Sequence, residues 1–219
     1  MRKFRAFSKA ALGAALFLTS GNAAAQGTDA PAQADQACEL HIWPSSGLRS
    51  VYYGWFHAGI VDGAVTGREG YPPVPKDPLP SALQIELMEK FGVPTALGLP
   101  AYKAIWHAEA LDSRAIRSTP GRLSSSTAAC YAELIGDDVF FQQDVFSGSY
   151  LKSLIRFRAF GPGPTPTRTF STWTQTQLTS FPPKEDSQNE AALKELRFAF
   201  TNNINAFGGF LNKPQKKKR

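Results

Sequence analysis

The sequence has few of the residues from which metal centres and catalytic sites are usually built. It contains two cysteines and three histidines in 219 residues, and neither CxxC nor HxxxH spacing occurs. These counts argue against a structural zinc site. P-loop, HExxH and G-x-S-x-G patterns are also absent. We therefore expect no bound metal and no cofactor.

Long apolar runs are absent after the first 25 residues. The chain opens with positive charges, continues with an apolar run from Ala10 to Leu18, and then reaches small residues at 23–25. This order is typical of a secretory signal peptide, and the run is about half the ~20 residues that span a bilayer. A retained amphipathic anchor is the alternative. We expect a signal peptide at 1–25, a flexible leader at 26–37, one globular domain at 38–212 and a basic tail at 213–219. The mature protein should be periplasmic or secreted, with no integral membrane segment.

Excess positive charge is confined to the two ends of the chain. The formal net charge is +6, from 24 Lys and Arg against 18 Asp and Glu. Four of the positive residues fall in the predicted signal peptide and five in the last seven residues. The body of the chain therefore has a net charge of about −3, from 15 positive and 18 negative residues. Such a body lacks the clustered positive face of a nucleic-acid-binding protein, so we expect no nucleic-acid partner.

The two cysteines, Cys38 and Cys130, are 92 residues apart. In an oxidising compartment the simplest interpretation of an isolated pair is one disulfide bond. Two buried free thiols are the alternative.

The hydrophobic pattern predicts an α+β domain with an antiparallel sheet of four to five strands and helices packed on one face. Strands are expected at 38–44, 102–111, 130–142, 151–160 and 170–181, where apolar residues alternate or run continuously. Helices are expected at 48–66, 81–91 and 189–211, the last two opened by capping boxes at Ser81-x-x-Gln84 and Ser187-x-x-Glu190. Residues 112–127 are expected to form a loop or a ragged hairpin.

The C-terminal helix should dock on the sheet through an apolar stripe. The stripe consists of Leu193, Leu196, Phe200, Ile204, Phe207 and Leu211. On this basis Phe200→Ala should cost ~3–5 kcal/mol. Glu195→Ala, on the opposite side of the helix, should cost under ~0.5 kcal/mol.

The order of elements over residues 80–212 resembles the small α/β domains of exported bacterial envelope proteins. Examples are the curli-secretion lipoprotein and the periplasmic activators of cell-wall synthases. The stretches ELHIWPSSGLRSVYYGWFHAGIVDGAVTGREGYP and YAELIGDDVFFQ resemble uncharacterised exported bacterial proteins. These resemblances imply an envelope location and bring no activity or site residues with them.

Weak catalytic candidates are His57 with Asp62, and the adjacent pair Asp137 and Asp138. His57 lies among aromatic residues and glycines, where a histidine is more often a satisfied core group. Adjacent aspartates on a regular strand point to opposite faces, which does not suit a shared-proton pair. A bulge at Gly136 would turn both outward, where they are most simply solvated turn carboxylates.

An aromatic cluster supplies the candidate binding residues Trp43, Tyr52, Tyr53 and Trp55. Aromatic side chains can line a groove for a sugar or a peptide, and they can equally form core. We therefore expect an exported, soluble, non-enzymatic accessory or binding protein of the bacterial envelope, whose partner is an unknown envelope protein or glycan. The alternative is an exported hydrolase with a site around His57 or Asp137/Asp138.

Overall fold

The computed structural model describes residues 37–53, 60–61, 74–144 and 147–214. These residues belong to one compact unit, Asp35–Arg219. The predicted signal peptide, most of the leader, and the candidates Trp55, His57 and Asp62 lie outside the described residues. In the described part of the chain, no helix is long and apolar enough to cross a membrane.

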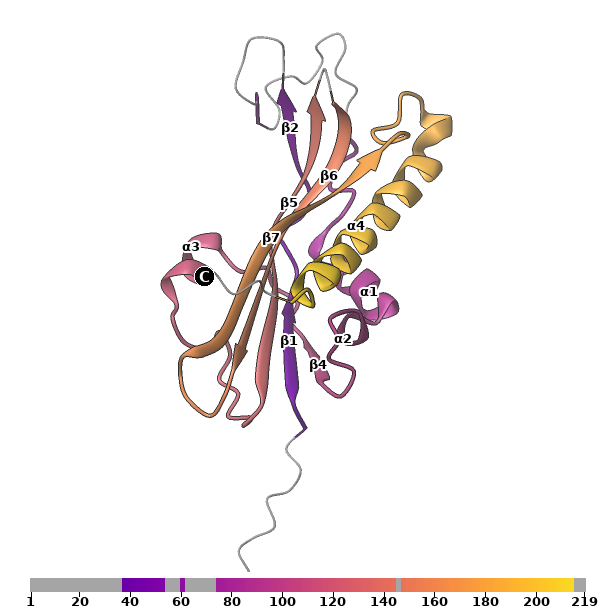
Figure 1. Ribbon diagram of the computed structural model, residues 1–219. Coiled ribbons are helices and arrows are strands. Elements are labelled where there is room, and N and C mark those ends of the chain that lie inside the picture. Colours follow the sequence, from indigo (N-terminus) through magenta and orange to yellow (C-terminus); the bar gives the residue numbers. More distant parts are fainter. Residues whose placement is uncertain (1–36, 54–59, 62–73, 145–146, 215–219) are drawn as a thin grey trace, which may run out of the picture. The chain divides into compact units, whose positions relative to one another are not determined.

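The described strands form one mixed sheet built around β5 (Tyr131–Asp144). On one side of β5, β6 (Gly148–Phe160) and then β7 (Pro166–Leu178) continue the sheet in antiparallel order. On its other side, β1 (Glu39–Trp43) pairs with its first half and β2 (Arg49–Tyr53) with its second half, both parallel to it. Next to β1 lies β4 (Lys103–Trp106), also parallel, and next to β2 lies the short antiparallel β3 (Ile60–Val61). Figure 1 shows this arrangement.

The expectation of a wholly antiparallel sheet of four to five strands is therefore wrong in part. The hairpins joining β5, β6 and β7 are antiparallel as predicted, whereas β1, β2 and β4 are parallel to β5 or to each other. Parallel neighbours need a long crossover connection, and the chain between β1 and β4 is such a connection. Because β4 and β5 follow each other in the chain with no helix expected between them, antiparallel pairing was expected, but β1 lies between them in the sheet.

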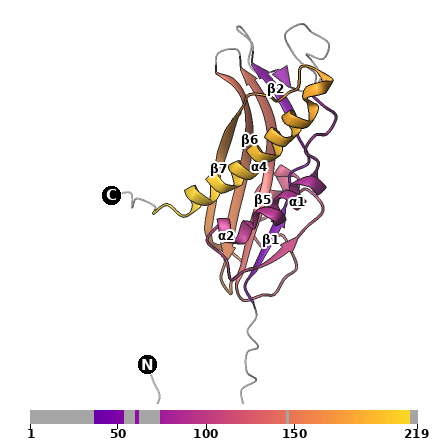
Figure 2. The same ribbon diagram turned by 90° about the vertical axis from the view of Figure 1, so that its right-hand side faces the viewer.

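The helices cover both faces of the sheet, and not one face as expected. On one face lie α1 (Ser81–Phe91), α2 (Val93–Ala96) and α4 (Asn189–Leu211), which follows the short 3₁₀ turn η1 (Asp186–Gln188). On the other face lies α3 (Ser113–Ser118), in the segment expected to be a loop or hairpin. Figures 1 and 2 show α4 along the sheet face that also carries α1 and α2. Asp112 caps α3, because its carboxylate accepts from the backbone N–H groups of Arg114 and Ala115.

Docking of α4 on the sheet is confirmed. Leu196, Phe200, Ile204 and Phe207 are buried in one core cluster with side chains of β5, β6 and β7. That burial is the main stabilising contribution that the helix makes.

Neither predicted capping box is formed. The N-cap residue of α1 is Pro80 and that of α4 is Gln188, and neither makes a side-chain cap bond. Gln84 is buried instead, where its side-chain oxygen accepts from the Ser45 N–H at 2.9 Å and its amide donates to the Leu79 carbonyl at 3.0 Å. Gln84 therefore anchors the backbone at Ser45 and Leu79 and does not cap its own helix.

The predicted helix at 48–66 is wrong where the structure describes it. Residues Arg49–Tyr53 form β2, with Val51 and Tyr52 buried. Pairing along β5 outweighed the weak helical spacing of the aromatic residues, since β-branched and aromatic side chains pack well on a half-buried sheet.

The predicted disulfide is present between Cys38 and Cys130, with a Cα–Cα distance of 4.6 Å. The two cysteines stand immediately before β1 and β5, and the Glu39 N–H donates to the Cys130 carbonyl at 3.0 Å. The bridge therefore joins the starts of two neighbouring parallel strands.

Candidate functional site

Alternation along β1 separates apolar from polar side chains. Leu40 and Ile42 are fully buried in the core under α4. Glu39, His41 and Trp43 are the intervening residues, so they face the other side of the sheet. His41 is only 5% exposed although it is polar. A buried imidazole at this place needs hydrogen-bonding partners.

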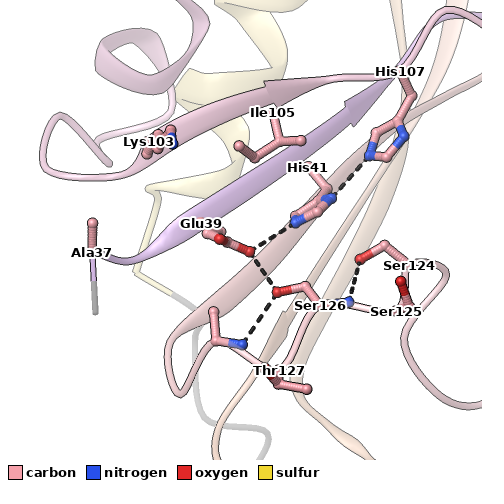
Figure 3. Close-up of a pocket in the computed structure, with 11 residues that line it drawn as sticks. Ala37, Glu39, His41, Lys103, Ile105, His107, Ser124, Ser125, Ser126 and Thr127 are labelled. Carbon is pink, nitrogen blue, oxygen red and sulfur yellow. Dashed lines mark hydrogen bonds and ion pairs between the residues drawn. The ribbon is translucent and has the colours of Figure 1, made fainter. Parts of the chain in front are cut away.

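A pocket of about 650 Å³ lies beside His41 on this face. It is formed by β1, by β4 with the residue that follows it, and by the segment 124–128 (Figure 3). Most of its lining side chains carry hydroxyl, carboxylate, amine or imidazole groups. The lining consists of Ala37, Glu39, His41, Lys103, Ile105, His107, Ser124, Ser125, Ser126, Thr127 and Ala128.

A chain of hydrogen bonds crosses the pocket wall. The Ser126 hydroxyl donates to Glu39 Oε2, and His41 Nε2 lies 3.0 Å from the same oxygen. His41 Nδ1 lies 2.9 Å from His107 Nε2. Because the ionised carboxylate can only accept, His41 Nε2 carries a proton, and the tautomers of the two rings decide which of His41 Nδ1 and His107 Nε2 donates to the other. Figure 3 shows this chain from Ser126 to His107.

Neighbouring groups shift the pKa values of Glu39 and His107 in this hydrogen-bond chain. Hydrogen bonds from Ser126 and then His41 hold the pKa of Glu39 below its usual value. Burial lowers the pKa of His107, and the neighbouring His41 adds to this effect. An ionised Glu39 and a neutral His107 are therefore favoured in the folded protein.

Aromatic side chains pack against the rings of His41 and His107. Trp43 stacks on His107 with ring centroids 4.0 Å apart and an interplanar angle of 6°. His41 lies against Tyr131, with ring centroids 4.7 Å apart. These contacts fix the orientation of the ring nitrogens that line the pocket.

A buried ionic network positions the segment 124–128. Glu133 is fully buried, pairs with Arg158, and accepts from the Tyr131 hydroxyl at 2.8 Å and the Leu123 N–H at 2.7 Å. Arg122 donates to the carbonyls of Ser126 and Ala128, both at 2.9 Å. The hydroxyl-rich wall of the pocket is thus tied to the sheet by charged groups, which form the stronger class of hydrogen bonds. Arg158 itself is only 9% exposed.

The aspartate pair lies outside this pocket. The register of β5 against β6 shifts between Gly136 and Asp138, so the strand has a bulge there. The bulge does not turn both carboxylates into solvent, because the Asp137 side chain is fully buried. Asp137 accepts from Arg156 Nε at 2.6 Å, whereas Asp138 accepts from Arg49. Each carboxylate therefore has its own arginine, and the two do not share a proton.

The aromatic candidates are not brought together as one binding surface. Tyr52 is buried in the main core beside Phe141, and Trp43 is buried with Ile116 and Ile135 in a small cluster under α3. Tyr53 is 37% exposed.

Sequence reasoning missed the residues that form the pocket wall. The alternation in residues 39–43 is a local signal that could have placed Glu39 and His41 on one face. No local signal connects them with His107 or Ser126, which reach the pocket only through the β1–β4 pairing and the loop before β5. In the described residues, no group of three or more His, Cys, Asp or Glu side chains could hold a metal ion.

Comparisons with known proteins do not assign this chain to a family. No family model and no curated protein matches the chain. Among solved structures, the chain is similar to a protein of Xanthomonas campestris assigned to family DUF330, with a TM-score of 0.42 and 7% identity over 80% of this chain and 83% of that one. It is also similar to an uncharacterized protein, with a TM-score of 0.31 and 6% identity over 80% of this chain and 88% of the other. The resemblance to the curli-secretion lipoprotein and the cell-wall synthase activators is not shown by these matches, and neither likeness supports an argument at these TM-scores.

Proposed function

We propose that this protein is an exported, non-enzymatic accessory or binding protein of the bacterial envelope, and that the pocket in Figure 3 binds a glycan. Support for export comes from the signal-like first 25 residues and from the Cys38–Cys130 disulfide, which persists in oxidising compartments. The observation that carries the ligand assignment is the polar pocket wall running from Ser126 through Glu39 and His41 to His107.

A glycan suits the chemistry of this wall. Sugar hydroxyls both donate and accept, so they need a mixed set of partners in fixed positions. The hydroxyls of Ser125 and Thr127 offer both roles, and Lys103 offers donors. Ile105 adds an apolar surface for the carbon face of a sugar ring.

The direction of the Ser126 hydrogen bond favours binding over hydrolysis. Nucleophilic catalysis by serine needs the hydroxyl to donate to a general base, which is usually an imidazole. Here the hydroxyl donates to Glu39, which already accepts from His41. Of the hydrolase candidates from the sequence, Asp137 and Asp138 are each paired with an arginine, and His57 and Asp62 lie outside the described residues. The hydrolase alternative therefore has less support than binding.

The proposal is tested by NMR titration of the isotopically labelled secreted protein with soluble peptidoglycan disaccharides. We expect amide shift changes at residues 39–41, 103–107 and 124–128. Ser126→Ala should weaken binding by roughly 3–10-fold, since one net hydrogen bond is worth about 0.5–1.5 kcal/mol. Ser171→Ala removes an exposed hydroxyl on β7 and serves as the matched control. Shift changes confined to other surfaces, or no changes at millimolar sugar, would contradict the proposal.

A further inference from the structure

β7 is an edge strand with an open side. It is 13 residues long, and in the part of the chain that the structure describes its only partner strand is β6. Figure 1 looks onto β7, with α3 on one side of the sheet and α4 on the other. In an antiparallel edge strand, alternate N–H and C=O groups point away from the sheet, and these are the groups that pair with an added strand.

From Thr169 onward, the sequence of β7 lacks the usual protection of an open edge. Natural edge strands are commonly blocked by lysines, prolines or bulges. From Thr169 to Leu178 β7 has no charged residue and no proline, and its register with β6 is regular over this stretch. The single irregularity lies at the start of the strand, opposite Phe160.

The exposed side of β7 also carries a large aromatic residue. Trp173 is 46% exposed and rests edge-on against Phe140 of β5, with ring centroids 5.3 Å apart. Its neighbours on the same face, Ser171 and Gln175, are exposed and uncharged. A half-exposed tryptophan in the middle of an uncharged edge strand is the kind of anchor found at protein interfaces.

We propose that two copies of the protein pair β7 with β7 in antiparallel orientation across a two-fold axis, which extends the sheet through the dimer. A strand can pair with its own copy in this way because the interface is then isologous. No like charges meet when the uncharged stretch faces itself. A register centred on residue 172, 173 or 174 brings the two Trp173 side chains together on one face, directly opposite or diagonally.

A second copy also matches the length of the open edge. The other outer strands described, β4 and β3, are four and two residues long, so neither offers an edge comparable to β7. The longest complementary edge that the described chain presents is therefore β7 itself.

The oligomeric state of the full secreted chain tests this proposal, measured by sedimentation velocity over a wide range of concentration. We expect a reversible dimer whose β7 amides exchange hydrogen more slowly as concentration rises. Trp173→Lys removes both tryptophans from the interface and opposes two new positive charges, so the dissociation constant should rise roughly 100-fold or more. Ser171→Lys adds the charge and keeps the tryptophan, and it should also weaken the dimer.

The control is Phe198→Lys on α4. Phe198 is the most exposed of the large apolar side chains described, at 65%, and does not lie on β7. This variant should dimerise like the wild type, and circular dichroism should show that all three variants are folded. A wild-type monomer at every concentration would overturn the proposal. So would a dimer that survives both β7 substitutions, or one that Phe198→Lys abolishes.

Discussion

Replacement of Glu195 should destabilise the fold far more than its position on the sequence suggests. The carboxylate accepts four hydrogen bonds from the connection between β7 and α4. These come from the N–H and hydroxyl of Thr179 at 2.8 and 2.7 Å, from the Ser180 N–H at 2.8 Å and from the Phe181 N–H at 2.9 Å. The expectation that Glu195→Ala costs under ~0.5 kcal/mol rested on an open helix face, and that premise is wrong.

The magnitude follows from which donors water can replace. Hydrogen bonds to a charged group contribute about 1.5–3 kcal/mol each when they are sheltered. Thr179 and Ser180 are exposed, so water replaces much of what their groups lose. Phe181 is 2% exposed, and its N–H loses a partner beside a buried ring. We count the hydrogen bond from the Phe181 N–H at full strength and the three bonds from Thr179 and Ser180 as small contributions. Glu195→Ala should therefore lower the free energy of unfolding by about 2–3 kcal/mol.

Urea unfolding at neutral pH measures this loss against Lys194→Ala, an exposed neighbour on the same helix. The control should change the free energy of unfolding by under ~0.5 kcal/mol. Glu195→Gln keeps one accepting oxygen without the charge and should fall between the two. Losses within ~0.5 kcal/mol of each other for Glu195→Ala and Lys194→Ala would refute the reasoning.

The pH dependence gives a second check. Partial burial would raise the pKa of Glu195, but the hydrogen bonds from Thr179, Ser180 and Phe181 outweigh it and hold the pKa below 4.5. A lowered folded-state pKa means that the stabilisation is present above the unfolded value and is lost as the pH falls through the folded one. The stability difference between wild type and Glu195→Gln should therefore shrink below about pH 4.5. A difference that stays constant down to strongly acidic pH would contradict this assignment.

Three further predictions concern the α4 contact, the disulfide and the pocket. A Cβ on Gly208 would stand 2.2 Å from the Ala96 carbonyl oxygen, whereas one on Gly209 would meet nothing within 4 Å. Thermal unfolding should therefore show a loss of about 1–3 kcal/mol for Gly208→Ala and a gain of up to ~1 kcal/mol for Gly209→Ala; equal effects would contradict the close approach. The Cys38–Cys130 bridge joins residues 92 positions apart, and its reduction should lower the free energy of unfolding by roughly 4–5 kcal/mol. A urea unfolding midpoint that does not change on reduction would contradict this contribution of the disulfide. Burial lowers the pKa of His107 from 6.5, so its NMR titration should have a midpoint below that value, and its contribution to stability should be lost as the pH falls from about 6.5. A midpoint at or above 6.5 would show that the imidazole is not buried as described.

Local patterns in the sequence were sufficient for the second half of the fold. The strands at β5, β6 and β7 and the helix α4 were predicted within a few residues, because alternation and the 3.6-residue period are set by neighbours along the chain. The disulfide was also predictable, since only one pairing of two cysteines exists.

Partner choice over long distances was not predictable in this way. The sequence of β2 has a weak helical spacing, yet its residues pair with the far half of β5. Gln84 was expected to cap its own helix and Glu195 to lie on an open helix face, but both hold distant or adjoining loops by hydrogen bonds. Such contacts depend on which other segments of the folded chain lie beside the residue. The type of a side chain does not specify that.

The candidate site shows the same division. The sequence by itself determined that β1 has one polar and one apolar side, because successive side chains of a strand point to opposite faces. Only the tertiary structure decided that His41 meets His107 and that Ser126 meets Glu39. These pairs join residues 66 and 87 positions apart, and they meet because the parallel pairing of β1 with β4 and β5 fixes the register of all three strands. Register of this kind is selected by the burial of whole strand faces, so it is a property of the assembled sheet and not of any one segment.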